Sequence, residues 1–332
     1  MATYNGEKYI EEQLLSICRQ TLKPDEIVIS DDGSRDSTLE IVDRVAKSED
    51  AQGIDFVVIT DNPRHGYCGN FEWAIQHTTG DIIFLSDQDD VWMPVKVERV
   101  CSVFMNYHDV QCVIHNSLMI DKEGNQIPGD FHRIIRLDKL PTDDHNVVHL
   151  EREALLERSV CNALANGMVM CLSREFLDTV LPFPKSTGSH DAWIGFCAMC
   201  NDCCWYLSEA LTMYRLHGEN TCGNGVVKAG FLKRAKRVFR RILKCESAIL
   251  ERYYLGEAMM KTIEKKHLTD HIAYETVKRV YDIGVIQVEA FRIGGIKGAC
   301  KLAKLYCSDM RYRRSGMGDF LYQFFAVLFH NK

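Results

Sequence analysis

The chain has 332 residues, of which 46% are apolar and 26% charged, and its net charge is −6. These values are typical of a globular protein and exclude intrinsic disorder and fibrous repeats as descriptions of the whole chain. The negative net charge provides no bulk attraction for nucleic acid. The length exceeds what one hydrophobic core usually organises, so we expect one large domain with an additional region.

The sequence contains no run of 18 apolar residues, and its first residues lack a basic segment followed by an apolar one. We therefore expect no membrane-spanning helix, no secretory signal and a cytoplasmic location. The fourteen cysteines are expected as buried free thiols. Cys200 and Cys203 have the spacing of half a zinc site, which is the alternative interpretation, but no second pair follows at zinc spacing.

Helix and strand patterns alternate through the first 120 residues. Apolar residues at helical spacing predict a helix within residues 7–21, and a Ser-x-x-Glu capping box predicts another from residue 37 to about 47. Strands are predicted at 26–30, 55–60, 81–86 and 110–120. Helices are predicted after the glycine-rich loop 63–69, ending at residue 77, and from residue 94 to about 107. This alternation predicts an α/β fold with a doubly wound, mostly parallel central sheet flanked by helices.

The second half continues with a weaker pattern. Residues 131–159 are polar and predict loops and a short helix, and the segments after them are strands at 167–172 and 205–215 and helices at 174–181 and 190–200. Beyond residue 225 the composition shifts to helix formers. We therefore expect a domain over residues 1–225 and a helical C-terminal region over residues 226–332.

Two acidic clusters follow predicted strands, Asp31-Asp32 and Asp87-Gln88-Asp89-Asp90. In open α/β sheets, ligands bind at the edge where parallel strands end. Carboxylates gathered there repel one another unless a divalent cation or sugar hydroxyls lie among them. An Asp-x-Asp turn can present two carboxylates to a metal–diphosphate unit, and Mg²⁺ or Mn²⁺ prefers such oxygen ligands. The alternative is that these residues only form turns and helix caps.

Three motifs in the same order resemble the signatures of family-2 glycosyltransferases: Thr3-Tyr4-Asn5-Gly6, the segment beginning Asp31-Asp32-Gly33-Ser34, and Leu85-Ser86-Asp87-Gln88-Asp89-Asp90. The resemblance extends from residue 1 to about 225 and is to the bacterial rhamnosyltransferase-like members that build surface polysaccharides. It implies the A-type, nucleotide-diphospho-sugar transferase fold, a nucleotide-sugar donor, a divalent metal and inversion at the anomeric carbon. It also divides the domain into a donor half, about 1–120, and an acceptor half, about 121–225.

The resemblance implies roles for residues in the donor half. Thr3, Tyr4 and Asn5 correspond to the loop beside the base. Asp32 corresponds to the carboxylate that holds the nucleoside, with Asp31 beside it. The Asp-x-Asp motif implies a ribose-side acid at Asp87 and a metal ligand at Asp89. The loop 62–66, with Asn70 further on, matches a segment that flanks the donor, where Arg64 either reaches a phosphate or is a solvated surface residue.

The acceptor half contains three further motifs. Ser189-His190-Asp191-Ala192-Trp193 resembles the family's acceptor-side His-Asp-x-Trp motif, which makes Asp191 the general base and places His190 and Trp193 on the acceptor side. From the residues alone, Asp191 is equally an N-cap. Gly167 resembles an acceptor-side glycine turn. His217, in an Arg-x-His-x-x-Asn motif, either completes the metal site, touches the diphosphate or is structural.

The start of the chain departs from the family pattern. Relatives usually have several apolar residues before the equivalent of Met1, so we expect a very short first strand and regard a truncated sequence or a misassigned start as its cause. Deleting an inner strand would leave neighbouring backbone groups unpaired.

Residues 228–244 contain eight basic residues and no acidic one, with apolar residues on one helical face. Such a basic amphipathic helix suits an anionic membrane surface. The alternative is a helix that packs its apolar face on the catalytic domain. Residues 320–329 are very apolar but too short to span a bilayer, so they either enter the membrane interface or cover the core.

These observations favour an inverting, metal-dependent glycosyltransferase. It would move a sugar from a nucleotide-diphosphate donor to a glycan or lipid-linked acceptor at the inner face of the plasma membrane, in cell-surface polysaccharide synthesis. A sugar nucleotidyltransferase is one alternative, but no glycine-rich loop with Arg or Lys occurs near the N-terminus. A non-catalytic, membrane-associated subunit of a polysaccharide assembly complex is another, although Asp32, Asp89 and Asp191 are all present.

Overall fold

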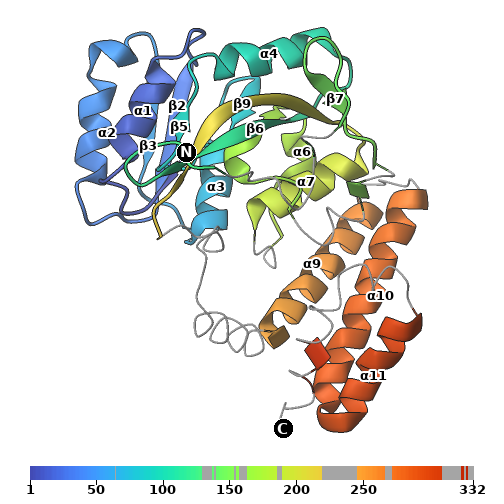
Figure 1. Cartoon of the computed structure of the whole chain (residues 1–332). Coiled ribbons are helices and arrows are strands. Elements are labelled where there is room, and N and C mark those ends of the chain that lie inside the picture. Colours follow the sequence, from blue (N-terminus) through green and yellow to red (C-terminus); the bar gives the residue numbers. More distant parts are fainter. Residues whose placement is uncertain are drawn as a thin grey trace. The chain divides into compact units, whose positions relative to one another are not determined.

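The computed structural model describes residues 1–63, 65–128, 137, 140–152, 155–156, 163–184, 189–218, 245–265, 271–308, 323–324 and 327 (Figure 1). The chain divides into two compact units, Met1–Phe183 with Ser189–Gly223, and Pro184–Gly188 with Asn224–Lys332. The described elements of the first unit are α/β, and those of the second are helical. Within the described ranges, no helix has both the length and the apolar composition needed to cross a bilayer.

Three parallel strands form the first sheet of the α/β unit. They are β1 (Ala2–Thr3), β2 (Glu26–Asp31) and β3 (Asp55–Ile59), in the order β1-β2-β3. The helices α1 (Ile10–Cys18) and α2 (Thr38–Ala46) connect them, because parallel neighbours need a crossover connection. A short 3₁₀ helix, η1 (Glu49–Ala51), follows α2. The predicted α/β class is thereby confirmed.

The apolar face predicted for residues 7–21 lies in the core of this sheet. The side chains that define it are at most 3% exposed: Ile10, Leu14, Ile17 and Cys18. They share one hydrophobic cluster with Ile27 and Ile29 of β2 and Val42 and Val45 of α2. Burying each large aliphatic side chain contributes about 1.5–3 kcal/mol. This packing fixes α1 and α2 against β2, and so fixes the loops that follow β1 and β2.

The second sheet has mixed strand directions. Its strands are β4 (Ile82–Phe84), β8 (Met170–Ser173), β6 (Cys112–Asp121), β9 (Cys204–Leu216) and β5 (Val91–Trp92), in the order β4-β8-β6-β9-β5, with β7 (Val147–His149) on β9. The β6–β9 pair is parallel, whereas β4–β8, β6–β8, β5–β9 and β7–β9 are antiparallel.

The helix–strand rhythm therefore predicted the strand directions only in part. The mostly parallel arrangement holds for the first sheet and for β6–β9, but β4 pairs with an antiparallel partner more than eighty residues away. The alternation of helices and strands predicts crossovers between consecutive strands, but it carries no information on strands that pair across a long stretch of chain. The strand β7, within residues predicted as loops and a short helix, was missed because three residues carry too little periodicity.

The helices of the α/β unit lie on both sides of the second sheet. Figure 1 shows α4 (Lys96–Asn106) on one side and α6 (Leu177–Val180) and α7 (His190–Cys200) on the other. The helix α7 has the predicted bounds and is buried almost all round, as a core helix should be. Its C-terminal Cys200 and the following Cys203 are buried free thiols. The helix α3 (Tyr67–Gln76) follows loop 62–66, so its first three residues lie within the segment 63–69 that was predicted as a loop.

The predicted capping box at the start of α2 is not formed. Ser37 makes no side-chain capping bond. Instead, Asp36 Oδ1 accepts from the Thr38 N–H at 3.1 Å, and Glu7 Oε2 accepts from the Ser37 N–H at 3.0 Å. A carboxylate one residue earlier therefore replaces the Ser cap, and the bond from Glu7 ties the start of α2 to the loop after β1.

The second unit consists of α9 (Cys245–Lys265), α10 (His271–Ile293) and α11 (Gly295–Ser308). The rings of Tyr253 and Tyr281 stack at 5.4 Å between α9 and α10. A Cβ at Gly298 would lie 2.2 Å from the Ala290 carbonyl oxygen, so α10 and α11 approach each other as closely as only glycine allows. The predicted basic segment 228–244 lies outside the described residues, and of the apolar segment 320–329 only residues 323, 324 and 327 are described.

Candidate functional site

Three loops meet at the edge where β1, β2 and β4 end. They follow Thr3, Asp31 and Phe84, respectively. The end of β9 and the start of α7 add His217 and Asp191 to the same side, because Asp191 acts electrostatically on Asp87 and His217 contacts Asp89. The sequence motifs that are far apart along the chain are thus brought to one edge.

Both oxygens of the Asp31 carboxylate accept hydrogen bonds from its own loop and from Thr3 of β1. It accepts from Thr3 Oγ1 at 2.7 Å, from Ser34 Oγ at 2.6 Å, and from the N–H groups of Ser34 and Gly33 at 2.7 and 3.1 Å. The residue is 1% exposed. Gly33 has a φ of +84°, which a residue with a side chain rarely adopts. Asp31 therefore shapes the turn after β2 and joins it to β1.

Asp32 points to the loop before α3. Its Oδ1 lies 2.7 Å from His65 Nδ1, and its Oδ2 accepts from the Gly66 N–H at 2.8 Å. Its side chain remains 16% exposed. Arg64, for which a phosphate contact and a solvated surface position are both open, lies outside the described residues. Asn70, the other predicted member of this segment, is buried and donates to the Thr3 carbonyl at 3.1 Å.

The loop after β1 is joined to the acidic loop by Gln88, a residue that the sequence analysis did not single out. The Tyr4 N–H donates to Gln88 Oε1 at 2.9 Å, and Gln88 Nε2 donates to the Tyr4 carbonyl at 3.1 Å. A Cβ at Gly6 would lie 2.4 Å from Gln88 Oε1, so a side chain there would displace the Gln88 amide. Tyr4 itself is 56% exposed. The backbone of Tyr4 holds the loop, and its ring remains exposed to solvent.

Asn5 completes the connection between the first two loops. Its N–H donates to Ser34 Oγ at 2.8 Å, and its Oδ1 accepts from the Arg35 N–H at 2.9 Å. It has a φ of +47°, a conformation that Asn tolerates better than most residues. The predicted Thr3-Tyr4-Asn5 loop is thus held on both sides, by the turn after β2 and by Gln88.

In contrast to Asp31, the acidic side chains after β4 lie close to one another. Asp87, Asp89 and Asp90 each offer a ligand oxygen, and these atoms lie within 4.8 Å of one another. Burial, followed by the charges of Asp89 and Asp191, raises the pKa of Asp87 to about 7. Burial and the charges of Asp89 and Asp87 also raise the pKa of Asp90 well above its usual range. Three carboxyl groups are therefore held together against their mutual repulsion.

This donor set fits a hard divalent cation. Asp90 is fully buried, and its Oδ2 has no hydrogen-bond partner among the described residues. A buried, unpaired carboxylate oxygen is costly unless a positive charge satisfies it. Mg²⁺ and Mn²⁺ favour carboxylate oxygens and retain positions for phosphate oxygens. His217 lies beside the cluster, with Nε2 2.7 Å from Asp89 Oδ2.

On the acceptor side, Asp191 lies in the first turn of α7 without being its N-cap. Ser189 is the N-cap, and its Oγ accepts from the Ala192 N–H, while Asp191 Oδ1 accepts from the same N–H at 2.7 Å. Burial raises the pKa of Asp191 to about 6, partly offset by backbone bonds from Ala192, Asp191 itself and Gly167. The N-cap alternative therefore does not hold, and the carboxylate is held by backbone groups.

His190 and Gly167 are in contact. A Cβ at Gly167, the first residue of the 3₁₀ helix η3 (Gly167–Val169), would lie 2.3 Å from His190 Nε2, so a side chain there would displace the His190 ring. The His190 ring stacks on Phe71 at 4.1 Å, and burial lowers the pKa of His190 to about 3. The ring is therefore neutral, and it packs the start of α7 against α3.

Trp193 lies in the core and not at the site. It is 1% exposed, and its Nε1–H donates to the Val180 carbonyl at 2.9 Å. The expected acceptor-side position of Trp193 is therefore corrected to one that holds α7 against α6.

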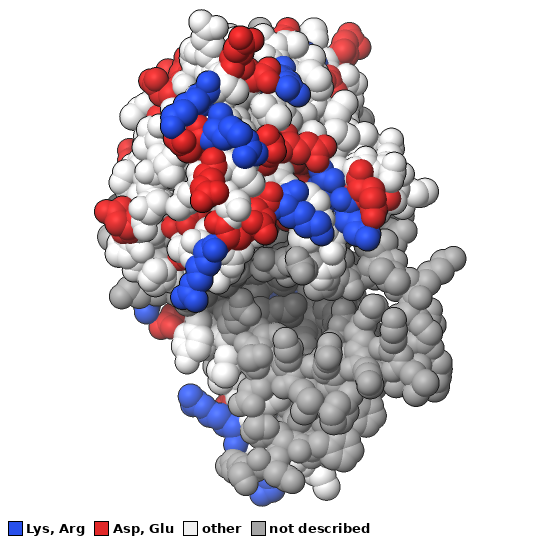
Figure 2. Space-filling model, turned by 90° about the vertical axis from the view of Figure 1, so that its left-hand side faces the viewer, with Lys and Arg blue, Asp and Glu red and all other residues white. Residues whose placement is uncertain are grey.

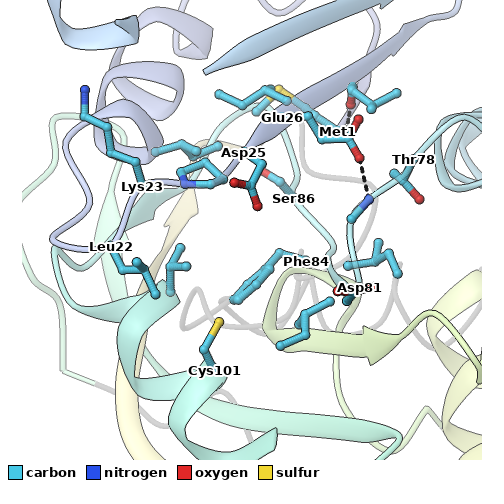
Figure 3. A pocket seen from close by; sticks show the side chains of 18 of the residues that line it. Met1, Leu22, Lys23, Asp25, Glu26, Thr78, Asp81, Phe84, Ser86 and Cys101 are labelled. Carbon is cyan, nitrogen blue, oxygen red and sulfur yellow. Dashed lines mark hydrogen bonds between the residues drawn. The ribbon is translucent and has the colours of Figure 1, made fainter. Parts of the chain in front are cut away.

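A cavity of about 340 Å³ lies between the starts of β2 and β4 (Figure 3). Its lining is mostly apolar and includes Met1, Val28 and Phe84. At its rim, Glu26 Oε1 accepts from the N–H groups of Thr79 and Gly80, at 2.5 and 2.9 Å. Glu26 and Ile82 begin their strands, and the lining extends to Ser86, the residue before Asp87 of the acidic loop.

The charges on the face shown in Figure 2 alternate in sign. Exposed ion pairs join residues of α1 and α2 or the segments beside them, as in Arg19–Asp50 at 2.8 Å and Arg44–Glu11 at 2.9 Å. Such pairs contribute about 0–1 kcal/mol each. In the described part of the chain this face is therefore of mixed charge.

Fold and site together define an α/β domain that has an acidic, cation-compatible edge. Residues 1–161 match the family described as Glycosyl transferase family 2. This part of the chain is a family-2 glycosyltransferase domain, so the family and the enzyme class expected from the motifs are confirmed.

Two curated relatives illustrate the similarity. The dTDP-rhamnosyl transferase RfbG of Shigella flexneri is 27% identical over 281 residues, covering 79% of this chain and 88% of that protein. An uncharacterized glycosyltransferase of Nostoc sp. is 27% identical over 222 residues. That match covers 66% of this chain and 64% of the Nostoc protein, so the chain matches less than two thirds of that relative's length.

Among solved structures, S. aureus TarS 1-349 in complex with UDP has the same fold. It aligns with a TM-score of 0.52 at 18% identity, covering 88% of this chain and 89% of that one. The predicted A-type glycosyltransferase fold is thereby confirmed.

Proposed function

We propose that this glycosyltransferase is inverting and metal-dependent, and that it transfers a sugar from a nucleotide-diphosphate donor to a glycan or lipid-linked acceptor in cell-surface polysaccharide synthesis. One observation carries the proposal. Three close carboxyl groups, at Asp87, Asp89 and Asp90, lie near a separate buried carboxylate, Asp191, whose pKa is raised to about 6. The first group suits a cation and a diphosphate, and the second suits a base.

The donor would lie along the edge formed by β1, β2 and β4. Asp32 keeps an exposed fraction and stands at the loop that Asp31 shapes, so it is placed to accept hydrogen bonds from the nucleoside. Tyr4 presents an exposed ring beside it, which suits stacking on a base. Asp87 would accept from the ribose hydroxyls. Asp31, with its oxygens occupied, would act by holding the loop.

Asp89 and His217 would hold the divalent cation, with Asp87 and Asp90 contributing charge. A bound Mg²⁺ or Mn²⁺ would supply the positive charge that stabilises the departing nucleoside diphosphate. The protein's own contribution is to keep these side chains close together at a site where water is partly excluded.

Asp191 would act as the general base. It takes the proton from the acceptor hydroxyl as that oxygen forms its bond to the anomeric carbon, while the bond from this carbon to the diphosphate oxygen breaks. A single displacement of this kind inverts the configuration. A pKa of about 6 keeps the carboxylate ionised at neutral pH yet more basic than an exposed Asp. The backbone bonds from Ala192 and Gly167 fix its direction.

The donor's sugar and base are proposed from a relative. RfbG is a dTDP-rhamnosyl transferase by name, and its match covers most of both chains. We therefore propose dTDP-rhamnose as the first donor to test, with UDP-N-acetylglucosamine for comparison.

The test incubates the protein with each donor and Mn²⁺ and measures nucleoside diphosphate release and the anomeric configuration of the product. Release that depends on Mn²⁺, with an inverted product, supports the proposal. Formation of pyrophosphate from a nucleoside triphosphate and a sugar phosphate would instead identify a nucleotidyltransferase. Donor binding without release, with every acceptor tried, would favour a non-catalytic subunit.

We also propose that residues 228–244 attach the protein to an anionic membrane surface at its cytoplasmic side. The support is the run of eight basic residues and the apolar helical face in the sequence. Co-sedimentation with anionic and neutral vesicles over a salt series tests this. Binding to anionic vesicles that high salt reverses is expected, because the Debye length falls from about 8 Å to about 3 Å at 1 M. Equal binding to both vesicles, or to neither, would contradict it.

A further inference from the structure

Arg215, near the end of β9, is buried against the acidic loop. The residue is 2% exposed. Its Nε–H donates to the Asp89 carbonyl at 2.9 Å, and its backbone N–H donates to Asp90 Oδ1 at 3.0 Å. One residue thus holds two consecutive positions of the loop that follows β4, one through its side chain and one through its backbone.

The guanidinium is itself fixed from the other side. Its second nitrogen donates to Glu12 Oε2 of α1 at 2.6 Å, and the group lies over the Tyr9 ring at 4.8 Å. The Tyr9 ring is also 5.0 Å from the His217 ring. Arg215 therefore joins three elements that are far apart in sequence: α1, the acidic loop and β9. Glu12 is mostly exposed, whereas the guanidinium between these groups is not.

A second buried cation lies nearby but makes a different set of contacts. Lys96 Nζ donates to the Met168 carbonyl and to Thr212 Oγ1, both at 3.0 Å, and lies over the Trp92 ring at 3.9 Å. Both of these hydrogen bonds go to groups outside the acidic cluster. Lys96 thus contributes positive charge at a distance, whereas Arg215 contributes both charge and the bonds that set the position of the loop.

We propose that Arg215 is a positioning residue that holds Asp89 and Asp90 in the arrangement that binds the divalent cation, and that Glu12 sets the direction of its guanidinium. This inference rests on the proposed metal dependence. It assigns no contact between Arg215 and the cation. A fork-shaped guanidinium is suited to the task because it can satisfy Asp89 and Glu12 at once, which a single ammonium group cannot do in the same geometry.

The test compares three variants with a matched control. Arg215→Gln removes the fork, Arg215→Lys keeps the charge without the fork, and Glu12→Gln weakens only the outer contact. The control is Arg99→Gln. It breaks the hydrogen bonds of 2.6–3.2 Å from Arg99 of α4 to Glu209, which lies on β9 as Arg215 does. Two quantities are measured: the Kd for Mn²⁺ alone, from the free-ion spectroscopic signal, and hydrogen exchange of residues 85–93 in metal-free protein.

Arg215→Gln is expected to weaken Mn²⁺ binding about 10–100-fold, as loss of an outer-shell partner typically does. It should also speed exchange in residues 85–93. Arg215→Lys should not restore either quantity, and Glu12→Gln should shift both in the same direction by a smaller factor. Arg99→Gln should lower the melting temperature without changing either quantity.

Unchanged Mn²⁺ affinity and unchanged exchange in Arg215→Gln would overturn the inference, as would full rescue by Lys. Should Arg215→Gln fail to fold, Glu12→Gln decides, because Glu12 is exposed: no change in either quantity overturns the inference. Should the unaltered protein bind no Mn²⁺, the proposed metal dependence fails. The exchange measurement on metal-free protein still decides whether Arg215 holds the loop.

Discussion

Two clusters of aspartates lie near strand ends in this fold, one at the end of β2 and one in the loop after β4, and they differ in how their oxygens are hydrogen-bonded. Asp31 accepts four hydrogen bonds from Thr3, Gly33 and Ser34. Asp90 keeps one carboxylate oxygen without a partner among the described residues, and its pKa is raised well above its usual range by burial and its acidic neighbours. The same residue type, near a strand end in both cases, builds a loop in one case and keeps an unpartnered oxygen in the other.

The difference shows where the binding energy for a charged ligand is available. A carboxylate that is fully hydrogen-bonded within the protein gains little from a cation, because its existing bonds would have to be given up. Carboxylates that repel one another give up no such bonds, so they gain the full electrostatic attraction of a bound cation. The predictions below separate the two clusters by experiment and are ordered by expected effect.

The largest effect is expected for Asp191→Asn. The amide keeps the shape and the contact with the Ala192 N–H but cannot accept a proton. We expect sugar transfer to slow about 10²–10⁴-fold, with donor binding retained. The rate is measured as nucleoside diphosphate release in the presence of acceptor. Asp202→Asn, beyond the other end of α7, is the control, and a comparable loss there or near-normal turnover in Asp191→Asn would remove Asp191 from the role of base.

A smaller but specific effect is expected for Asp89→Asn. It removes a charge from the repelling cluster and breaks the pairing with His217. We expect Mn²⁺ to bind about 10–100-fold more weakly and the Mn²⁺-dependent part of nucleotide binding to disappear. Calorimetric titration with Mn²⁺ and with nucleoside diphosphate measures both. Unaltered Mn²⁺-dependent binding would show that Asp89 is not a ligand.

The pH dependence of transfer should report Asp191. Its pKa is raised to about 6 by burial, and a base must be deprotonated to act. The rate should therefore fall as the pH drops through about 6, by roughly tenfold for each unit below it, and level off above it. The measurement is the transfer rate at saturating donor between pH 4.5 and 8. A rate independent of pH between 5 and 7 would contradict the assignment.

The smallest effect on chemistry, and a clear one on stability, is expected for Asp31→Asn. The amide nitrogen would face donors such as Ser34 and Thr3, leaving buried groups without acceptors. We expect a loss of about 1–3 kcal/mol in the free energy of unfolding. Chemical denaturation measures this loss. Unchanged stability, with Mn²⁺ affinity lost instead, would place Asp31 in the cation site.

The sequence predicted those parts of the structure in which one segment contains its own signal. The helix 190–200, the apolar face of α1 and the strand beginning at Glu26 all follow from local periodicity. The acidic motifs were also expected to follow strands, and Asp32 follows β2 while Asp87 lies in the loop after β4. What periodicity cannot report is which distant group satisfies a side chain: the bonds of Asp31, the pairing of Gln88 with Tyr4 and the contacts of Arg215 are all made across long stretches of chain.

Two further differences have the same origin. Trp193 matches an acceptor-side motif, but tertiary packing buries its ring and gives its N–H to Val180. The antiparallel pairing of β4 with β8 depends on a loop that returns from far along the chain. In both cases, the sequence identified the residues and the fold decided their surroundings.

Thermal unfolding with and without Mn²⁺ and nucleoside diphosphate tests most directly whether the two acidic clusters have opposite roles. A ligand present at about 100 times its Kd stabilises the folded state by about 2.7 kcal/mol. We predict that the unaltered protein and Asp31→Asn both gain stability from the ligands, although Asp31→Asn starts from a lower melting temperature. Asp89→Asn should start at or above the unaltered protein and gain nothing from Mn²⁺. A full Mn²⁺ response in Asp89→Asn, or its loss in Asp31→Asn at an unchanged melting temperature, would contradict the account.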